Sequence, residues 1–186
     1  DSVTAAYGSG FGDNSIRGIL QTAVTAANIS VFDRSQRDPD LRGMGTTIVA
    51  CIVCDGIAHI VHAGDSRAYH ITAEGIEQMT KDHSVVQLLV DRGEITQDEA
   101  RFHPKKHFIT RALGVMSIID LDYCEFALDE GEAIIICTDG LSNYFTSGEL
   151  FDMVKAAGYG KCVDKLINAA KKAGGADNIT VVCISK

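Results

Sequence analysis

The sequence lacks any apolar run that approaches the ~20 residues of a membrane-spanning helix, so we expect no membrane segment in this chain. Basic residues are also few: 17 Lys and Arg stand against 25 Asp and Glu, and the net charge of −8 argues against a nucleic-acid partner. Internal repeats, low-complexity tracts and interdomain linkers are absent as well. With 46% hydrophobic residues, the 186-residue chain is predicted to form a single domain over residues 1–186.

The N-terminus lacks the features of a secretion signal. Its first residues, Asp1-Ser2-Val3-Thr4, contain neither a basic stretch nor an apolar core. They also lack an initiating Met, which indicates a processed or trimmed part of a longer protein.

The six Cys residues do not form a metal-binding or redox motif. Cys51 and Cys54 have a suitable spacing, but residues three positions apart on a strand point to opposite faces. Most of the six lie within apolar segments such as Ile48–Cys54. We therefore expect buried, reduced thiols in a protein of the cytoplasm.

The chain does contain clear helix and strand patterns. Apolar residues from Ile16 to Val31 follow helical spacing, with Asn14 or Ser15 as the N-cap, and a polar loop is expected over 33–42. Three turn sequences then predict three hairpins. Their paired strands are 46–54 with 57–63, 67–72 with 76–80, and 120–128 with 132–138.

Residues 84–113 interrupt this strand pattern. Ser84 is predicted to cap a short helix that ends near Gly93. Thr96 begins a capping box that opens a second helix, and Pro104 ends that helix. Helices at 146–157 and 161–173 and a last strand at 178–184 follow. Amphipathic helices at both ends and antiparallel hairpins between them predict an α+β fold, with helices layered on antiparallel sheet.

Two acidic turns border the apolar strands near the C-terminus. Asp139 follows the strand that ends at Cys137, and Asp177 precedes the last strand. If these strands are antiparallel neighbours, the two turns meet at one edge of the sheet. Carboxylates that close repel unless a cation or a proton lies between them, and all-oxygen ligands suit Mg²⁺ or Mn²⁺. The turns predict either a hard-metal site or two ordinary Asp turns, since Asp-Gly is a common turn pair.

A third acidic turn, at Asp65, follows the strand 57–63, and three such turns in one domain call for a common cause. The motif that contains this turn and five other motifs occur in a fixed order along the chain. This ordered set closely resembles the pattern of the metal-dependent serine/threonine protein phosphatases of type 2C, in their compact bacterial form. The resemblance extends from about Ser15 to Lys186. The six motifs are Gly43-Met44-Gly45-Thr46-Thr47, Gly64-Asp65-Ser66-Arg67, Asp82-His83-Ser84, Ile109-Thr110-Arg111-Ala112-Leu113-Gly114, Thr138-Asp139-Gly140 and Ala176-Asp177-Asn178.

The resemblance implies a four-layer α-β-β-α sandwich of two antiparallel sheets flanked by helices. It also implies a pair of divalent ions, Mn²⁺ or Mg²⁺, bridged by a water. By motif, Asp139 and Asp177 would bind the first ion, and Asp65 and Asp139 would hold a weaker third one. The segment 84–113 would be the mobile flap beside the active site.

We expect the histidines of the strands and motifs, and one motif arginine, to have structural roles. His83 and Arg111 belong to family motifs, but we assign neither a catalytic role. His59, His62 and His70 lie on predicted strands, where we expect histidines with satisfied hydrogen bonds.

The opening section of the family pattern has no counterpart in this sequence. That section supplies an Arg that contacts phosphate, a Glu-Asp pair on the first strand, and an Asp-Gly-x-Gly-Gly stretch near a His. The Asp of that stretch bridges the metals, and the His is the proposed general acid. Here the two Asp-Gly pairs are Asp55-Gly56, in a hairpin turn, and Asp139-Gly140. We therefore expect the N-terminal strands to be missing, no catalytic residue to be assignable, and the chain alone to be inactive.

The leading interpretation is dephosphorylation of phosphoserine and phosphothreonine in proteins, the substrates of serine/threonine kinases, by a metal-activated water. An alternative is a non-catalytic binding or regulatory domain with the phosphatase fold. Three converging carboxylates argue against that alternative, and the missing opening section argues for it. A phosphohydrolase with an aspartyl nucleophile fits poorly, because its Asp-x-Asp belongs on the first strand and 46–54 contains none.

Overall fold

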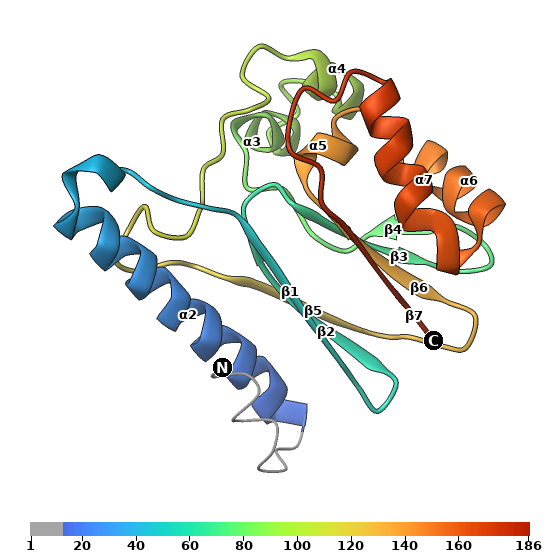
Figure 1. The fold of residues 1–186 in the computed structure, drawn as a ribbon, viewed down its shortest axis with the longest axis horizontal. Coiled ribbons are helices and arrows are strands. Elements are labelled where there is room, and N and C mark those ends of the chain that lie inside the picture. Colours follow the sequence, from blue (N-terminus) through green and yellow to red (C-terminus); the bar gives the residue numbers. More distant parts are fainter. Residues whose placement is uncertain (1–12) are drawn as a thin grey trace.

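The computed structural model describes residues 13–186, with side chains from Ile16 onward, as four layers (Figure 1). Two antiparallel sheets form the middle, in the strand orders β1-β2-β5 and β4-β3-β6-β7. Helix α2 covers the outer face of the first sheet, and α6 and α7 cover the outer face of the second. The predicted α-β-β-α sandwich is therefore confirmed. The strands are β1 (Ile48–Cys54), β2 (Ile57–Ala63), β3 (Arg67–Ile71), β4 (Ile76–Gln78), β5 (Asp122–Ala127), β6 (Ala133–Cys137) and β7 (Val181–Ser185), and these three helices are α2 (Asp13–Arg37), α6 (Ser147–Ala157) and α7 (Tyr159–Lys172).

Each interface between layers has its own apolar core. Leu20 and Val24 of α2 pack on one face of the first sheet, and Ile60 and Ile134 are buried between the sheets. Leu166 of α7 belongs to a third cluster, between the second sheet and its helices. Cys51 contributes to the core between the sheets and Cys54 to the core under α2, so the prediction that they face opposite sides is confirmed.

The third predicted hairpin is wrong. The turn at 129–131 connects two strands of different sheets, because β5 pairs with β2 whereas β6 pairs with β3 and β7. Consecutive residues of β6, such as Ile134 and Ile135, are both buried, so this strand is covered on both faces. Its two edges are taken by β3 and β7, which leaves no edge for β5. The first two hairpins form as expected, and the β1–β2 turn has positive φ at Asp55 and Gly56.

Helix α2 is longer than its sequence pattern predicts. It includes Asn14 and Ser15, so neither is its N-cap, and it continues to Arg37 through the start of the expected polar loop. Ser35 is buried there, and Arg37 pairs with Asp33 one turn earlier at 3.6 Å. A short 3₁₀ turn, η1 (Pro39–Leu41), follows. No helix in the described part of the chain is both long and apolar enough to cross a membrane.

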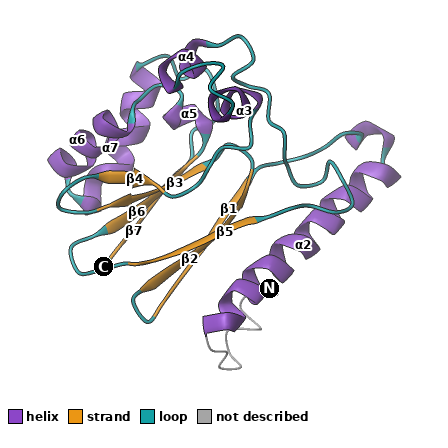
Figure 2. Cartoon of the chain, turned by 180° about the vertical axis from the view of Figure 1, so that it is seen from behind, coloured by secondary structure: helices purple, strands orange, loops and turns teal. Residues whose placement is uncertain are grey.

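The segment 84–113 folds as two short helices, α3 (Val85–Asp91) and α4 (Gln97–Phe102), near the C-terminal end of β6 (Figure 2). Ser84 caps α3 and Thr96 forms a capping box with Glu99, as predicted. That these residues act as a mobile flap remains a prediction.

Two strand edges are open on one side of the sandwich. The Sγ atom of Cys124 on β5 donates to the carbonyl of Met79 after β4, so β5 and β4 lie together and the opposite ends of the sheets are β1 and β7. Every residue of β1 is only partly buried, and Val182 of β7 is 45% exposed. Within residues 13–186, no strand pairs with these outer edges. Unpaired edges of this kind accept further strands.

Candidate metal centre

The ends of β6 and β7 meet as the sequence predicts. The two strands are antiparallel, with Cys137 opposite Val181. Beyond that pair, the N–H of Thr138 donates to the Thr180 carbonyl at 3.1 Å, and the Thr180 N–H donates to Thr138 Oγ1 at 3.0 Å. The turn carrying Asp139 therefore lies beside the segment that carries Asp177.

Gly140 brings these two turns into backbone contact. It lies in the short helix α5 (Asp139–Ser142), and a Cβ added to it would lie 2.2 Å from the carbonyl oxygen of Asn178. Only a residue without a side chain permits this approach. The Asp177 carboxylate is fixed locally, since its Oδ1 accepts from the Asn178 N–H at 2.7 Å.

We expect Gly140→Ala to destabilise the chain by about 1–3 kcal/mol, because the new methyl group must push the Asn178 backbone away. The same shift would separate the two acidic turns and weaken Mn²⁺ binding. Urea unfolding and Mn²⁺ titration measure the two effects. Gly148→Ala in α6 is the matched control, because a Cβ there meets nothing within 4 Å. Equal stability of the two variants would contradict the close contact.

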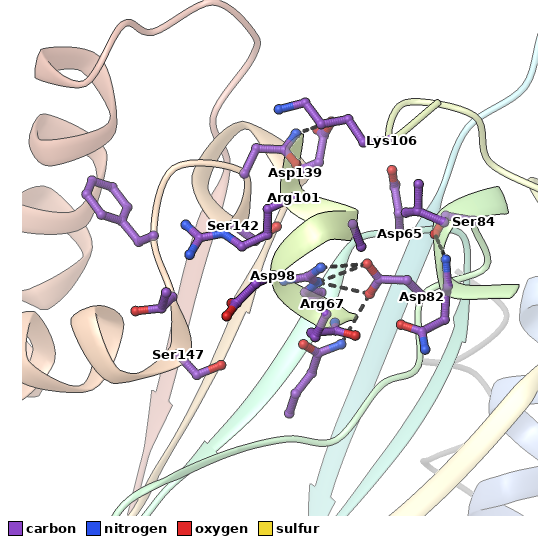
Figure 3. Close-up of a pocket in the computed structure, with 18 residues that line it drawn as sticks. Asp65, Arg67, Asp82, Ser84, Asp98, Arg101, Lys106, Asp139, Ser142 and Ser147 are labelled. Carbon is purple, nitrogen blue, oxygen red and sulfur yellow. Dashed lines mark hydrogen bonds and ion pairs between the residues drawn. The ribbon is translucent and has the colours of Figure 1, made fainter. Parts of the chain in front are cut away.

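Asp65 shares a pocket with Asp139. Both line a cavity of about 250 Å³ between the strand ends, α3–α4 and the start of α6 (Figure 3). Burial and, to a smaller extent, the nearby charges of Asp139 and Asp82 together raise the pKa of Asp65 to about 6. Arg67 does not balance this charge well, because its guanidinium binds Asp82 with contacts of 2.7 and 2.9 Å. The pocket therefore presents a partly buried carboxylate that favours a proton or a cation.

We expect Asp65→Asn to stabilise the chain in EDTA by about 1 kcal/mol at neutral to mildly alkaline pH, a value discounted for the partial exposure of Asp65. A pKa raised to about 6 means that the folded state binds more protons than the unfolded state between about pH 4 and that value. The stability that Asp65 contributes is thus lost as pH rises through this range. Asp65→Asn, whose amide does not ionise, does not suffer this loss. Urea unfolding with and without excess Mn²⁺ measures this: the metal should reverse the ranking, and a less stable Asp65→Asn in EDTA would contradict it.

The donor chemistry fits a divalent ion with a preference for oxygen. Asp65 and Asp139 supply carboxylates to one pocket, and Asp177 lies on the turn in contact with that of Asp139. Mg²⁺ and Mn²⁺ bind such ligands. Among the described residues, the three aspartates do not form a group within 4.8 Å of one another, so the convergence that the sequence predicts is not seen at that distance. A bridging distance between Asp139 and Asp177 remains a prediction.

The flap residues that line the pocket are absent from the sequence-based site. Asp98, Arg101 and Lys106 come from α4 and the loop after it, and they line the same cavity as Asp65 and Asp139 (Figure 3). No sequence pattern indicated them, because their place depends on how α4 folds back over the strand ends.

A second polar cluster was also missed: His62, His83 and Asp122 each bring one ligand-type atom within 4.8 Å of the others. It does not converge on a metal ion. Arg111 Nη1 already lies 2.9 Å from His83 Nε2 and 2.6 Å from Asp122 Oδ1, so a cation occupies that place. The rings of His62 and His83 are stacked at 4.7 Å with planes 6° apart, and in-plane lone pairs of parallel rings do not point to one ion.

The prediction of satisfied strand histidines is correct only in part. His70 pairs with Glu132 at 2.8 Å. His59 and His62 each bond through one nitrogen, to Tyr123 and to the Lys81 carbonyl, while His59 Nε2 and His62 Nδ1 have no partner in the described residues.

A family model and a relative of known activity both match most of this chain. A family model described as Protein phosphatase 2C matches residues 5–179. The serine/threonine phosphatase stp of Listeria monocytogenes serotype 4b (strain F2365) is 34% identical over 168 residues, which cover 90% of this chain and 67% of the relative.

Solved structures agree with the sequence comparison. The serine/threonine phosphatase Stp1 from Staphylococcus aureus superposes with a TM-score of 0.92 at 28% identity, covering 100% of this chain and 74% of that one. The catalytic domain of the serine/threonine protein phosphatase PstP, solved in complex with 2 manganese ions, has a TM-score of 0.84 at 32% identity, with 97% and 77% covered. This chain thus spans about two thirds to three quarters of these relatives.

Proposed function

Because this chain belongs to the protein phosphatase 2C family, we propose that it supplies the metal-binding strand ends and the flap of a protein serine/threonine phosphatase. The reaction is hydrolysis of phosphoserine and phosphothreonine esters in proteins. The observation that carries the proposal is the shared pocket of Asp65 and Asp139, in which burial and like charge raise the pKa of Asp65. A pocket of this kind is stabilised by a cation.

In this proposal, Asp139 and Asp177 hold the first Mn²⁺ or Mg²⁺ ion, and Asp65 and Asp139 hold a weaker third one. Bound divalent ions supply a nucleophilic water at neutral pH and neutralise the phosphoryl oxygens. The strand ends keep the carboxylates in a rigid arrangement, which such an electrostatic role needs. Arg101 and Lys106, which line the same cavity, would offer positive charge to the dianionic phosphoryl group of a substrate.

The substrates would be proteins phosphorylated by serine/threonine kinases, and the site of action would be the cytoplasm. The surface of the segment 84–113 suits a protein substrate, because Phe102 and Phe108, close in sequence to the pocket residues Arg101 and Lys106, are 84% and 60% exposed.

We also propose that this chain is an incomplete catalytic domain. Support comes from the open edges of β1 and β7, which lie on one side of the sandwich and leave Val182 45% exposed. Two further strands on these edges would complete both sheets and would bring the Glu-Asp pair and bridging Asp of the family pattern toward the Asp139 turn. The competing function, a non-catalytic binding domain, would not need the unbalanced charge of Asp65.

The test is a phosphatase assay on a version extended upstream in the parent gene, with an aryl phosphate and a phosphothreonine peptide. Millimolar Mn²⁺ should give turnover of both substrates, and EDTA should remove it. Tight binding of the phosphopeptide without turnover at any Mn²⁺ concentration would instead support the non-catalytic domain.

A further inference from the structure

We propose that His83 is a positioning residue, which fixes the backbone of Gly64 and through it the direction of the Asp65 carboxylate. The inference rests on the proposed function, in which Asp65 is a metal ligand. It assigns a role to the buried histidine cluster outside the pocket, which the proposed reaction does not otherwise use.

Both backbone groups of Gly64 are held by His83. The Gly64 N–H donates to His83 Nδ1 at 3.1 Å, and the His83 N–H donates to the Gly64 carbonyl at 2.9 Å. The ring that accepts this bond is 8% exposed. Asp65 is the next residue along the chain, so its Cα position depends on these two bonds.

The rest of the turn has little freedom to compensate. Gly64 has φ +114, and a Cβ there would lie 2.4 Å from Thr47 Cγ2. On the other side of Asp65, the hydroxyl of Ser66 is hydrogen-bonded to that of Thr47 at 2.8 Å. Thr47 therefore limits the turn from one side, and His83 is the polar anchor on the other.

The bond from Gly64 also decides the tautomer of His83. Because Nδ1 accepts, the proton of the neutral ring lies on Nε2. Asp122 Oδ2 at 3.3 Å can accept that proton, so Arg111 Nη1, 2.9 Å from Nε2, is a close neighbour there and does not donate to the ring. Arg111 donates to the other oxygen of Asp122 and so holds this carboxylate in place. Burial lowers the pKa of His83 despite the opposing hydrogen bond to Asp122, and the charge of Arg111 acts in the same direction as burial, which favours the neutral, accepting ring. Asp122 and Arg111 thus orient His83, which orients the metal-ligand turn.

Two isosteric substitutions separate this role from packing. In His83→Asn, Oδ1 stands where Nδ1 was and still accepts from Gly64. In His83→Gln, the polar group stands at the position of Nε2 and that bond is lost. Both variants remove the ring and its stack on His62. We expect Mn²⁺ affinity at the weaker site of Asp65 and Asp139, measured by electron paramagnetic resonance of the free ion, to fall about 10-fold or more in His83→Gln and to stay within about 2-fold in His83→Asn.

A measurement on the unmodified chain does not depend on how the variants fold. In ¹⁵N-labelled protein, His83 Nδ1 should show the chemical shift of an unprotonated ring nitrogen and a scalar coupling to the Gly64 amide nitrogen. A protonated Nδ1 would overturn the inference, and so would equal loss of Mn²⁺ affinity in the two variants.

Asp65→Asn separates this inference from the proposed function. If Asp65→Asn lowers Mn²⁺ affinity but the two His83 variants do not differ, only the role of His83 is wrong. If Asp65→Asn leaves Mn²⁺ binding at the weaker site unchanged, the assignment of Asp65 as a metal ligand is wrong and the inference falls with it.

Discussion

Asp139→Asn in the upstream-extended protein should lower phosphatase activity by about 10³-fold or more, the largest effect we expect from one substitution. Asp139 is the single carboxylate assigned to both the first ion and the third. Metal ions contribute several kcal/mol of charge stabilisation to phosphoryl transfer, and each 1.36 kcal/mol corresponds to about tenfold in rate. The measurement is turnover of an aryl phosphate at saturating Mn²⁺, together with Mn²⁺ binding.

The matched control is Asp164→Asn, which removes an equal charge from an exposed position on α7. It should leave turnover and Mn²⁺ binding unchanged. Folding of Asp139→Asn is checked by urea unfolding in EDTA, where removal of a charge next to Asp65 should not reduce stability. Activity of Asp139→Asn within about tenfold of the unmodified protein would remove Asp139 from the centre of the site.

The second large effect concerns the chain of 186 residues by itself, which we expect to give no turnover above background with either substrate. Asp139 and Asp177 would hold one ion weakly, because no residue of the sequence matches the bridging Asp of the family pattern. The general acid of that pattern is also unmatched, and such a group typically contributes 10²–10⁴-fold. The assay compares this chain with the upstream-extended version at equal concentration and saturating Mn²⁺.

Far-UV circular dichroism and urea unfolding accompany this comparison, so that loss of activity is not confused with loss of the fold. The open edges of β1 and β7 also predict association between copies of the shorter chain, which sedimentation detects. Turnover of the shorter chain comparable with that of the extended version would show that the catalytic site lies elsewhere.

Local sequence signals predicted the elements well, because each depended on residues close in the chain. The Asp55-Gly56 turn, the Ser84 cap and the Thr96 capping box all form as expected. The meeting of the β6 and β7 ends was predictable as well, since it needs only two antiparallel neighbours.

Features that depend on choice of partner were not predictable in this way. The turn at 129–131 has the composition of a hairpin, but β3 and β7 pair with the two edges of β6, and β5 pairs with β2 in the other sheet. The site likewise contains some features that local sequence predicts and others that depend on the fold. The acidic turns at Asp65 and Asp139 are visible in the sequence, whereas the contact of His83 with Gly64 joins residues 19 positions apart through a fold that no local pattern specifies.

The most direct test of the metal assignment is a crystal structure of the upstream-extended protein grown with Mn²⁺, in which anomalous scattering locates each ion. We predict one strong peak in contact with the carboxylates of both Asp139 and Asp177, and a weaker peak between Asp65 and Asp139. Strong peaks that all lie away from Asp139, or an ion bound by His62 and His83 with Arg111 displaced, would contradict the assignment.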